Sequence, residues 1–330
     1  MKHTITTLLV GTTSLGLVFG SAGPASADRG GRPGTYQLTG DPGGSKFEGI
    51  GVDERRGLFY VSEVTGGEIH RGTARSPRTE QWLSGDGTDG RFTARGITTD
   101  RAGNVYIAGG PNGLGTGRPD LWVYDRHGNL LAALRAPAEN VFLNDVWIGP
   151  DGAAYFTNSN APQVFRVDAQ HGGFEVELWA DATGTIATSP GFNLGGIVTS
   201  PDRRSLIVAQ GNAGRLWRFD LADRSIAQVD THGADLVDAD GLVLRGSRLI
   251  VVRNFSRIVT TLRLAHDGTS ARLVNDRASD PDRVLTTAKV LRGRILYVDS
   301  KFDEQVAAPP YEVVTNPFVS RHAGQSAPSR

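Results

Sequence analysis

The chain has 330 residues, with 35 basic and 35 acidic side chains and therefore no net charge at neutral pH. The chain therefore has no net field that would favour binding to nucleic acids or anionic membranes, and we expect neither partner. The sequence contains no cysteine, which excludes disulfides, zinc–thiolate sites and cysteine nucleophiles.

The first residues have the order of an export signal. A short polar start precedes an apolar stretch at residues 4–20, and small residues ending at Ala27 follow it. The stretch is short, rich in threonine and glycine, and lacks basic residues on its far side, so we expect no membrane span. The sequence predicts a signal peptide over residues 1–27, secretion from the cell, and one monomeric domain over residues 28–330.

One sequence pattern recurs six times after the export signal. Each copy opens with a small or polar residue, continues through alternating apolar positions to a turn, and then enters an apolar β run. The equivalent opening positions are Glu48, Arg95, Asn144, Gly195, Asp240 and Thr287. Successive positions are 45 to 51 residues apart by subtraction, which is typical of four-stranded propeller blades.

The β runs within the copies are rich in β-branched and aromatic residues, as strands should be. A β-sandwich is the alternative, but it gives no reason for a repeat of constant length. The sequence therefore predicts an all-β, six-bladed β-propeller with four-stranded blades. Two further β-like segments, which begin at Thr35 and Tyr311, lie outside the repeats and are expected to close the ring in one shared blade.

The opening positions are candidates for a functional site, because equivalent positions of a propeller form a ring at one end of the central channel. The carboxylates of Glu48 and Asp240 would repel each other there, and the amide of Asn144 would lack a hydrogen-bond partner, unless a cation lay between them. Calcium suits this all-oxygen set best, with zinc, manganese or magnesium as alternatives. Such a cation could polarise an ester carbonyl and activate water without a serine or cysteine nucleophile.

These residues and their order resemble the SMP-30/gluconolactonase superfamily, which includes the paraoxonase-like lactonases. In that superfamily a Glu on the first blade, Asn on the third and fourth, and Asp on the fifth surround the metal or its substrate. Glu48 in FEGIGVD, Asn144 in FLNDVWI and Asp240 in DADGLVL match three of the four. The resemblance covers nearly the whole predicted mature chain and implies a metal-dependent hydrolase of a small-molecule lactone or related ester.

The fourth-blade position departs from this pattern. The superfamily has Asn-Gly followed by an apolar residue, whereas this chain has Gly195-Gly196-Ile197. Asn193 could replace the missing amide, or backbone carbonyls and waters could complete the shell. The departure leaves a second function open, a secreted non-catalytic propeller that binds a ligand or envelope partner and keeps a structural or vestigial metal site. The expected metal ligands are Glu48, Asn144, Asn193 and Asp240.

The remaining assignments concern single side chains. Glu48 and Asp240 are the expected catalytic residues, with Asp240 as general base because nearby Asp238 should raise its pKa. Asn144 is also expected to contact the substrate.

Arg95 either binds an anionic substrate group or balances the charges of the two acids. Trp147 either lines the pocket or packs between blades with the other tryptophans. We expect surface turns for His70, His127, His171, His232 and His266.

Overall fold

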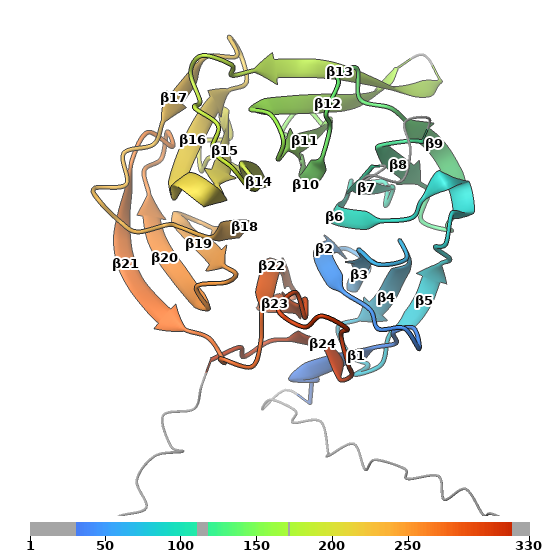
Figure 1. Ribbon diagram of the computed structural model, residues 1–330. Helices are drawn as coiled ribbons and strands as arrows, with labels where there is room; N and C mark the ends of the chain where they lie inside the picture. The colour runs from blue at the N-terminus through green and yellow to red at the C-terminus, as the bar shows by residue number, and fades with distance from the viewer. Residues whose placement is uncertain (1–30, 111–117, 171, 319–330) are drawn as a thin grey trace, which may run out of the picture.

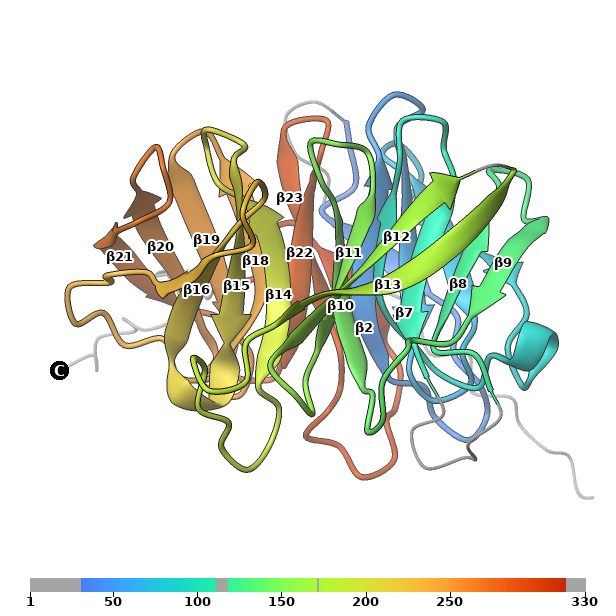
Figure 2. The same cartoon turned by 90° about the horizontal axis from the view of Figure 1, so that it is seen from above.

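The computed structural model describes residues 31–110, 118–170 and 172–318 (Figure 1). These residues form six four-stranded antiparallel sheets around a central axis, so the predicted six-bladed β-propeller is confirmed (Figures 1 and 2). The predicted signal peptide, residues 1–27, lies outside the described residues. Within the described residues, no helix is long and apolar enough to cross a membrane.

The blades follow the order of the chain, and the strands of each blade run in sequence from the axis outward. Blade 1 contains β2 (Phe47–Asp53), β3 (Leu58–Glu63), β4 (Ile69–Thr73) and β5 (Glu80–Leu83). Blade 2 contains β6 (Ala94–Thr99), β7 (Val105–Gly109), β8 (Leu121–Tyr124) and β9 (Leu130–Leu134). Blade 3 contains β10 (Leu143–Ile148), β11 (Ala154–Asn158), β12 (Gln163–Gln170) and β13 (Gly173–Asp181).

The second half of the ring has the same plan, except that the outermost strand of the last blade comes from the start of the chain. Blade 4 contains β14 (Leu194–Thr199), β15 (Ser205–Gln210), β16 (Arg215–Asp220) and β17 (Ile226–Gln228). Blade 5 contains β18 (Ala239–Arg245), β19 (Arg248–Arg253), β20 (Ile258–Leu264) and β21 (Ala271–Ala278). Blade 6 contains β22 (Leu285–Leu291), β23 (Arg294–Asp299), β24 (Tyr311–Val314) and β1 (Thr35–Leu38). Short 3-10 helices are η1 (Thr88–Gly90) and η2 (Gly211–Ala213).

The core lies between neighbouring blades. Strands near the axis are covered on both faces, which is why β15 reads as a nearly continuous apolar run, whereas β21 on the rim is mostly exposed. Trp179 and Trp217 pack together between blades 3 and 4, and Trp122 fills the space between blades 1 and 2. The expectation that these tryptophans pack between blades is therefore confirmed.

The two ends of the described chain close the ring in blade 6. Strand β1 pairs antiparallel with β24, and β24 pairs with β23, so the first strand completes the last blade. Tyr36 and Val313 from this shared sheet join the same buried cluster as Phe47 of blade 1. This arrangement confirms the predicted closure and leaves no unpaired seam between the first and last blades.

Every innermost strand has a register shift, typical of a β-bulge, after its first residue. The first residues inside the shifts are Glu48, Arg95, Asn144, Gly195, Asp240 and Thr286. A bulge re-aims the side chain it contains, which explains why these positions share one role in the ring. The sixth position is Thr286, so the assignment of Thr287 to the ring was wrong by one residue.

The second residue of the bulge is glycine in four blades because the next blade approaches its backbone closely. A Cβ on Gly49 would lie 2.1 Å from the carbonyl oxygen of Arg95, and one on Gly196 would lie 2.1 Å from that of Asp240. No side chain fits at such distances. The repeated glycine therefore holds neighbouring ring positions side by side around the axis.

Candidate functional site

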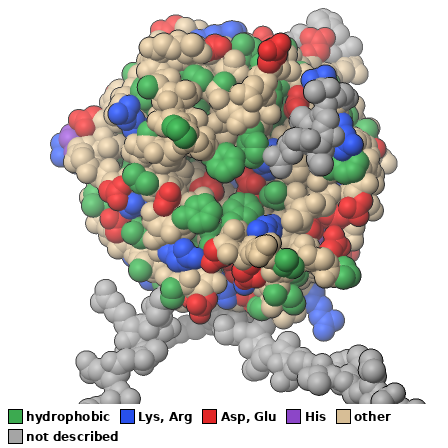
Figure 3. Space-filling model, in the orientation of Figure 1, with side chains coloured by type: hydrophobic (Ala, Val, Ile, Leu, Met, Phe, Trp, Pro, Cys, Tyr) green, Lys and Arg blue, Asp and Glu red, His purple; other side chains and the backbone are tan. Residues whose placement is uncertain are grey.

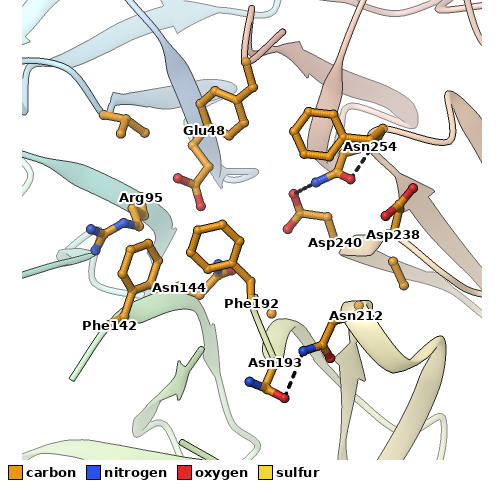
Figure 4. A pocket seen from close by; sticks show the side chains of 16 residues that line it. Glu48, Arg95, Phe142, Asn144, Phe192, Asn193, Asn212, Asp238, Asp240 and Asn254 are labelled. Atoms are coloured by element: carbon orange, nitrogen blue, oxygen red, sulfur yellow. Dashed lines mark hydrogen bonds between the residues drawn. The ribbon is translucent and has the colours of Figure 1, made fainter. Parts of the chain in front are cut away.

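A cavity of about 420 Å³ lies at the end of the channel where the innermost strands begin. Five of the six ring positions line it, together with residues of the surrounding loops (Figure 4). The five are Glu48, Arg95, Asn144, Gly195 and Asp240. The structure thus brings together side chains that are spread over almost 200 residues of sequence, as the repeat predicted.

The two carboxyl groups of the cavity are held in an environment that disfavours their charge. Burial is the main cause that raises the pKa of Glu48 to about 8; Arg95 opposes this rise, and the charges of Asp240 and Asp145 contribute to it. Burial likewise raises the pKa of Asp240 to about 7, with Asp145 adding to the effect. A cation between these groups would restore the charged form of both.

The side chains of blades 1, 3 and 5 face a common space beside Gly195. A Cβ on Gly195 would stand 3.6 Å from Asn144 Oδ1 and 3.7 Å from Asp240 Oδ1. Figure 4 shows the Glu48 carboxylate pointing into the same space. Among the described residues, the side chains of Glu48 and Asn144 have no hydrogen-bond partner. Two half-buried carboxylates and an uncommitted amide are a donor set that fits a hard divalent cation.

The amide of Asn193 lines the cavity but is committed to its own loop. Its Oδ1 accepts hydrogen bonds from Ser189 N at 2.9 Å and Asn212 Nδ2 at 3.1 Å. Its Nδ2 donates to Ser159 O at 3.2 Å. The hypothesis that Asn193 replaces the missing fourth-blade amide is not supported, because ligation would break these contacts.

A neighbour that the sequence did not reveal orients Asp240. Asn254 Nδ2 donates a hydrogen bond to Asp240 Oδ2 at 3.0 Å, which leaves Oδ1 on the side of Gly195. The expected influence of Asp238 is absent, because its carboxylate accepts from Ser256 Oγ at 2.7 Å and the charge acting on Asp240 is that of Asp145. Asn254 follows the apolar run of β19 in a turn, where no repeat position marks it.

Arg95 is buried at the edge of the cavity. Its Nη1 donates to the carbonyls of Gly109 at 2.6 Å and Leu143 at 3.1 Å, and its guanidinium lies 3.5 Å from the centre of the Phe142 ring. Burial lowers the pKa of Arg95 to about 10, so the group is charged at neutral pH. This geometry favours charge balance with Glu48, and a direct substrate contact stays a prediction.

Trp147 does not line the central cavity, so the prediction that it contacts the substrate there was wrong. It lines a second cavity of about 200 Å³, where Lys289 Nζ lies 5.0 Å from the centre of its ring. A strand advances about 3.3 Å per residue, so three residues carry Trp147 roughly 10 Å along the channel from Asn144.

Aromatic side chains surround the mouth of the cavity. Phe142, Phe192, Phe255 and Phe302 contribute to its lining. Phe192 and Phe255 are 60% and 51% exposed, and the ring centres of Phe142 and Phe192 are 5.0 Å apart. Figure 3 shows hydrophobic side chains gathered near the centre of this face, with acidic ones between them. The repeat gave little signal for this rim, because only Phe142 and Phe192 lie near ring positions in the sequence.

Comparison with protein families gives one extended match. Residues 47–252 match the family described as SMP-30/Gluconolactonase/LRE-like region. These residues are more than half of the chain and include all the ring positions from blade 1 to blade 5. No curated protein sequence matches the chain significantly.

Solved structures share the fold at low sequence identity. The major allergen Mala s 1 of Malassezia sympodialis has a TM-score of 0.61 at 14% identity, over 88% of this chain and 99% of that one. A gluconolactonase of Xanthomonas campestris has a TM-score of 0.58 at 15% identity, over 83% and 87%. The calcium-binding protein regucalcin of Agrobacterium tumefaciens has a TM-score of 0.57 at 17% identity, over 83% and 95%.

Proposed function

Since the chain belongs to the SMP-30/gluconolactonase/LRE-like family, we propose that it is a secreted, metal-dependent hydrolase of lactones or related esters. One observation carries this proposal: Glu48, Asn144 and Asp240, from three different blades, face one cavity at the mouth of the channel. The gluconolactonase and the calcium-binding regucalcin among the structural neighbours are consistent with it. The propeller fold alone would not support this function, because proteins with this fold have many different functions.

The donor set favours calcium as the cofactor, with zinc, manganese or magnesium as alternatives. Glu48 and Asp240 would supply carboxylate oxygens and Asn144 an amide oxygen, which are the ligands that hard cations prefer. When bound, the ion would supply a Lewis acid that polarises an ester carbonyl. Gly195 leaves room beside these ligands for water or for the substrate.

Asp240 is the proposed general base. A charged carboxylate that faces the cavity can accept a proton from a water molecule held there. Asn254 holds Oδ2, so Oδ1 is the oxygen that faces the cavity. Glu48 stands on the opposite side of the same space and is the proposed second catalytic carboxylate (Figure 4).

The aromatic rim favours substrates with an apolar substituent. Exposed rings such as those of Phe192 and Phe255 bind hydrocarbon better than hydroxyl groups, and apolar walls with a few polar groups are typical of small-molecule sites. We expect alkyl-substituted or aryl-substituted lactones and esters to be hydrolysed faster than a fully hydroxylated sugar lactone.

Hydrolysis of a lactone panel, followed by acid release in a pH-stat, tests the function. We expect turnover that EDTA abolishes and that excess calcium restores, with large losses in Glu48→Gln and Asp240→Asn. Glu80→Gln is the matched control, because Glu80 is an exposed glutamate on the outer strand of blade 1. Turnover that is indifferent to EDTA and to both cavity variants would exclude the proposed mechanism.

A non-catalytic, ligand-binding propeller is the second candidate function. Gly195 favours it, because one amide ligand of the family pattern is missing and Asn193 does not replace it. A protein that retains a metal after dialysis and binds a lactone, yet hydrolyses no member of the panel, would support this candidate.

The proposal that the protein is secreted depends only on the predicted signal peptide, residues 1–27. The intact mass of protein collected from the culture medium should correspond to a chain that begins at Asp28. Protein that stays in the cells with its first residues intact would contradict this part of the proposal.

A further inference from the structure

A second group of acidic side chains lies on blade 1, and none of them lines the central cavity. Asp41 belongs to the connection between β1 and β2, Glu63 ends β3, and Glu68 stands just before β4. One carboxylate oxygen from each lies within 4.8 Å of the other two. Glu63 and Glu68 are only 1% and 5% exposed, whereas Asp41 is exposed. We call these three residues the blade 1 cluster.

Buried polar atoms around the blade 1 cluster have no partners. Glu68 Oε2 is buried and accepts no hydrogen bond from the described residues. His70 is 2% exposed, both of its ring nitrogens lack hydrogen-bond partners there, and its Nε2 lies 3.6 Å from Glu63 Oε2. The expectation that His70 is a surface residue was therefore wrong, whereas His127, His232 and His266 are exposed, and His171 lies outside the described residues. Unsatisfied buried groups are costly, so several of them together indicate a missing ligand.

Negative charge is concentrated at this place. Burial raises the pKa of Glu68, and the charges of Glu63, Asp41 and Asp86 raise it further. Burial also raises the pKa of Asp41, with Glu63 and Asp86 adding to the effect. The charged forms of Asp41 and Glu68 are thus disfavoured, and a divalent cation beside them would reverse this effect.

We propose that the blade 1 cluster binds a second divalent cation, of the hard, oxygen-preferring class to which calcium belongs. Calcium takes carboxylate oxygens at about 2.3–2.6 Å and tolerates irregular geometry. Oxygens no more than 4.8 Å apart can therefore lie on opposite sides of one ion. The buried imidazole of His70, whose ring nitrogens make no hydrogen bond to the described residues, lies against the Glu63 end of the cluster.

The cation would connect the two ends of the ring. Asp41 lies in a turn in which its N–H donates to Ser45 Oγ at 2.8 Å, and Ser45 N donates to Tyr311 Oη at 3.2 Å. Tyr311 and the strand β1 belong to blade 6, whereas Glu63 and Glu68 belong to blade 1. Metal binding by the blade 1 cluster therefore stabilises the closure of the propeller, a role separate from catalysis.

Calcium titration by calorimetry in a Glu48→Gln background isolates this site from the central one. We expect that protein to bind one calcium ion, and we expect binding at least tenfold weaker once Asp41→Asn or Glu68→Gln is added. Asp41 is exposed, so Asp41→Asn leaves the buried packing unchanged. Asp86→Asn is the matched control: Asp86 is a nearby charge outside the cluster, and asparagine tolerates its positive φ. We expect its affinity to change by less than about threefold.

Thermal unfolding provides a second readout in the same background. Calcium should raise Tm by a few degrees at concentrations well above Kd, and Asp41→Asn should remove this rise. An absence of calcium binding in the Glu48→Gln protein, or unchanged binding with Asp41→Asn and Glu68→Gln, would overturn the proposal. Lactone hydrolysis by the unmutated protein is measured separately, so failure of the proposed function would not be confused with failure of this site.

Discussion

The central cavity and the blade 1 cluster use the same donor chemistry in two different settings. Glu48 and Asp240 come from different blades and open onto a cavity of about 420 Å³. Glu63 ends one strand of blade 1, Glu68 stands just before the next, and both side chains are buried. A carboxylate group needs adjoining space for a substrate before it can act in catalysis. For this reason we propose catalysis for the central group and stabilisation of the ring for the other.

Removal of a central carboxylate should have the largest effect. We expect Glu48→Gln and Asp240→Asn to lower kcat/KM by about 100-fold to 10,000-fold, the usual range for loss of a positioned acid–base group. Glu68→Gln in the blade 1 cluster should change kcat/KM by less than about twofold in calcium, since it lies outside the cavity lining. Initial rates on the best lactone check both. Equal losses in all three variants would erase the distinction between the two groups.

An asparagine at the fourth-blade ring position should increase the calcium affinity of the central cavity and leave that of the blade 1 cluster unchanged. A side chain at position 195 meets Asn144 and Asp240 at ordinary contact distances, so Gly195→Asn fits and adds one oxygen ligand. We expect calcium to bind the cavity roughly tenfold more tightly, the equivalent of one further interaction of about 1.4 kcal/mol. Gly196→Asn is the control that should not fold, because its Cβ would lie 2.1 Å from a backbone oxygen. Unchanged affinity in Gly195→Asn would mean that the ligand shell is already complete.

The pH dependence of stability should report the central carboxyls when metal is removed. The folded-state pKa of Glu48, about 8, lies above its ordinary value of 4.5, so the folded protein holds a proton that the unfolded chain releases. In EDTA, the contribution of Glu48 to the free energy of unfolding should therefore be greatest below pH 4.5. It should decrease as the pH rises towards 8. Urea midpoints at about pH 5, 7 and 9 measure this fall, and Glu48→Gln should make it shallower. An identical fall in both proteins would refute the assignment.

The smallest effect is expected at the aromatic rim. Phe192→Ala removes an exposed ring, so we expect KM for an alkyl-substituted lactone to rise by about threefold to tenfold, in line with the partial burial of one ring against the substrate. kcat should change little, because the ring touches no reacting group. Leu273→Ala, at an exposed apolar residue on the outer strand of blade 5, is the matched control. A loss confined to kcat would contradict the proposed role.

The features of the fold and of the site that follow from the sequence repeat could be predicted. Glu48, Asn144 and Asp240 occupy equivalent positions, so their convergence followed from the period alone, as did the number of blades and the closure by β1 and β24. The period could not resolve the bulge in β22, which placed Thr286 where Thr287 was expected.

Features outside the repeat could not be predicted in the same way. The orientation of Asn254 and the commitment of Asn193 depend on loop conformations that only the folded backbone reveals. The blade 1 cluster joins a connection to two strand ends within one blade, and nothing periodic in the sequence marks Asp41 as a member or His70 as its neighbour.

Anomalous diffraction from a crystal soaked in manganese tests the central claim most directly. We predict a peak in the cavity between the carboxylates of Glu48 and Asp240, within ligand distance of Asn144 Oδ1. Full occupancy of the blade 1 cluster with no peak in the cavity would contradict the claim that the ring positions share one catalytic cation.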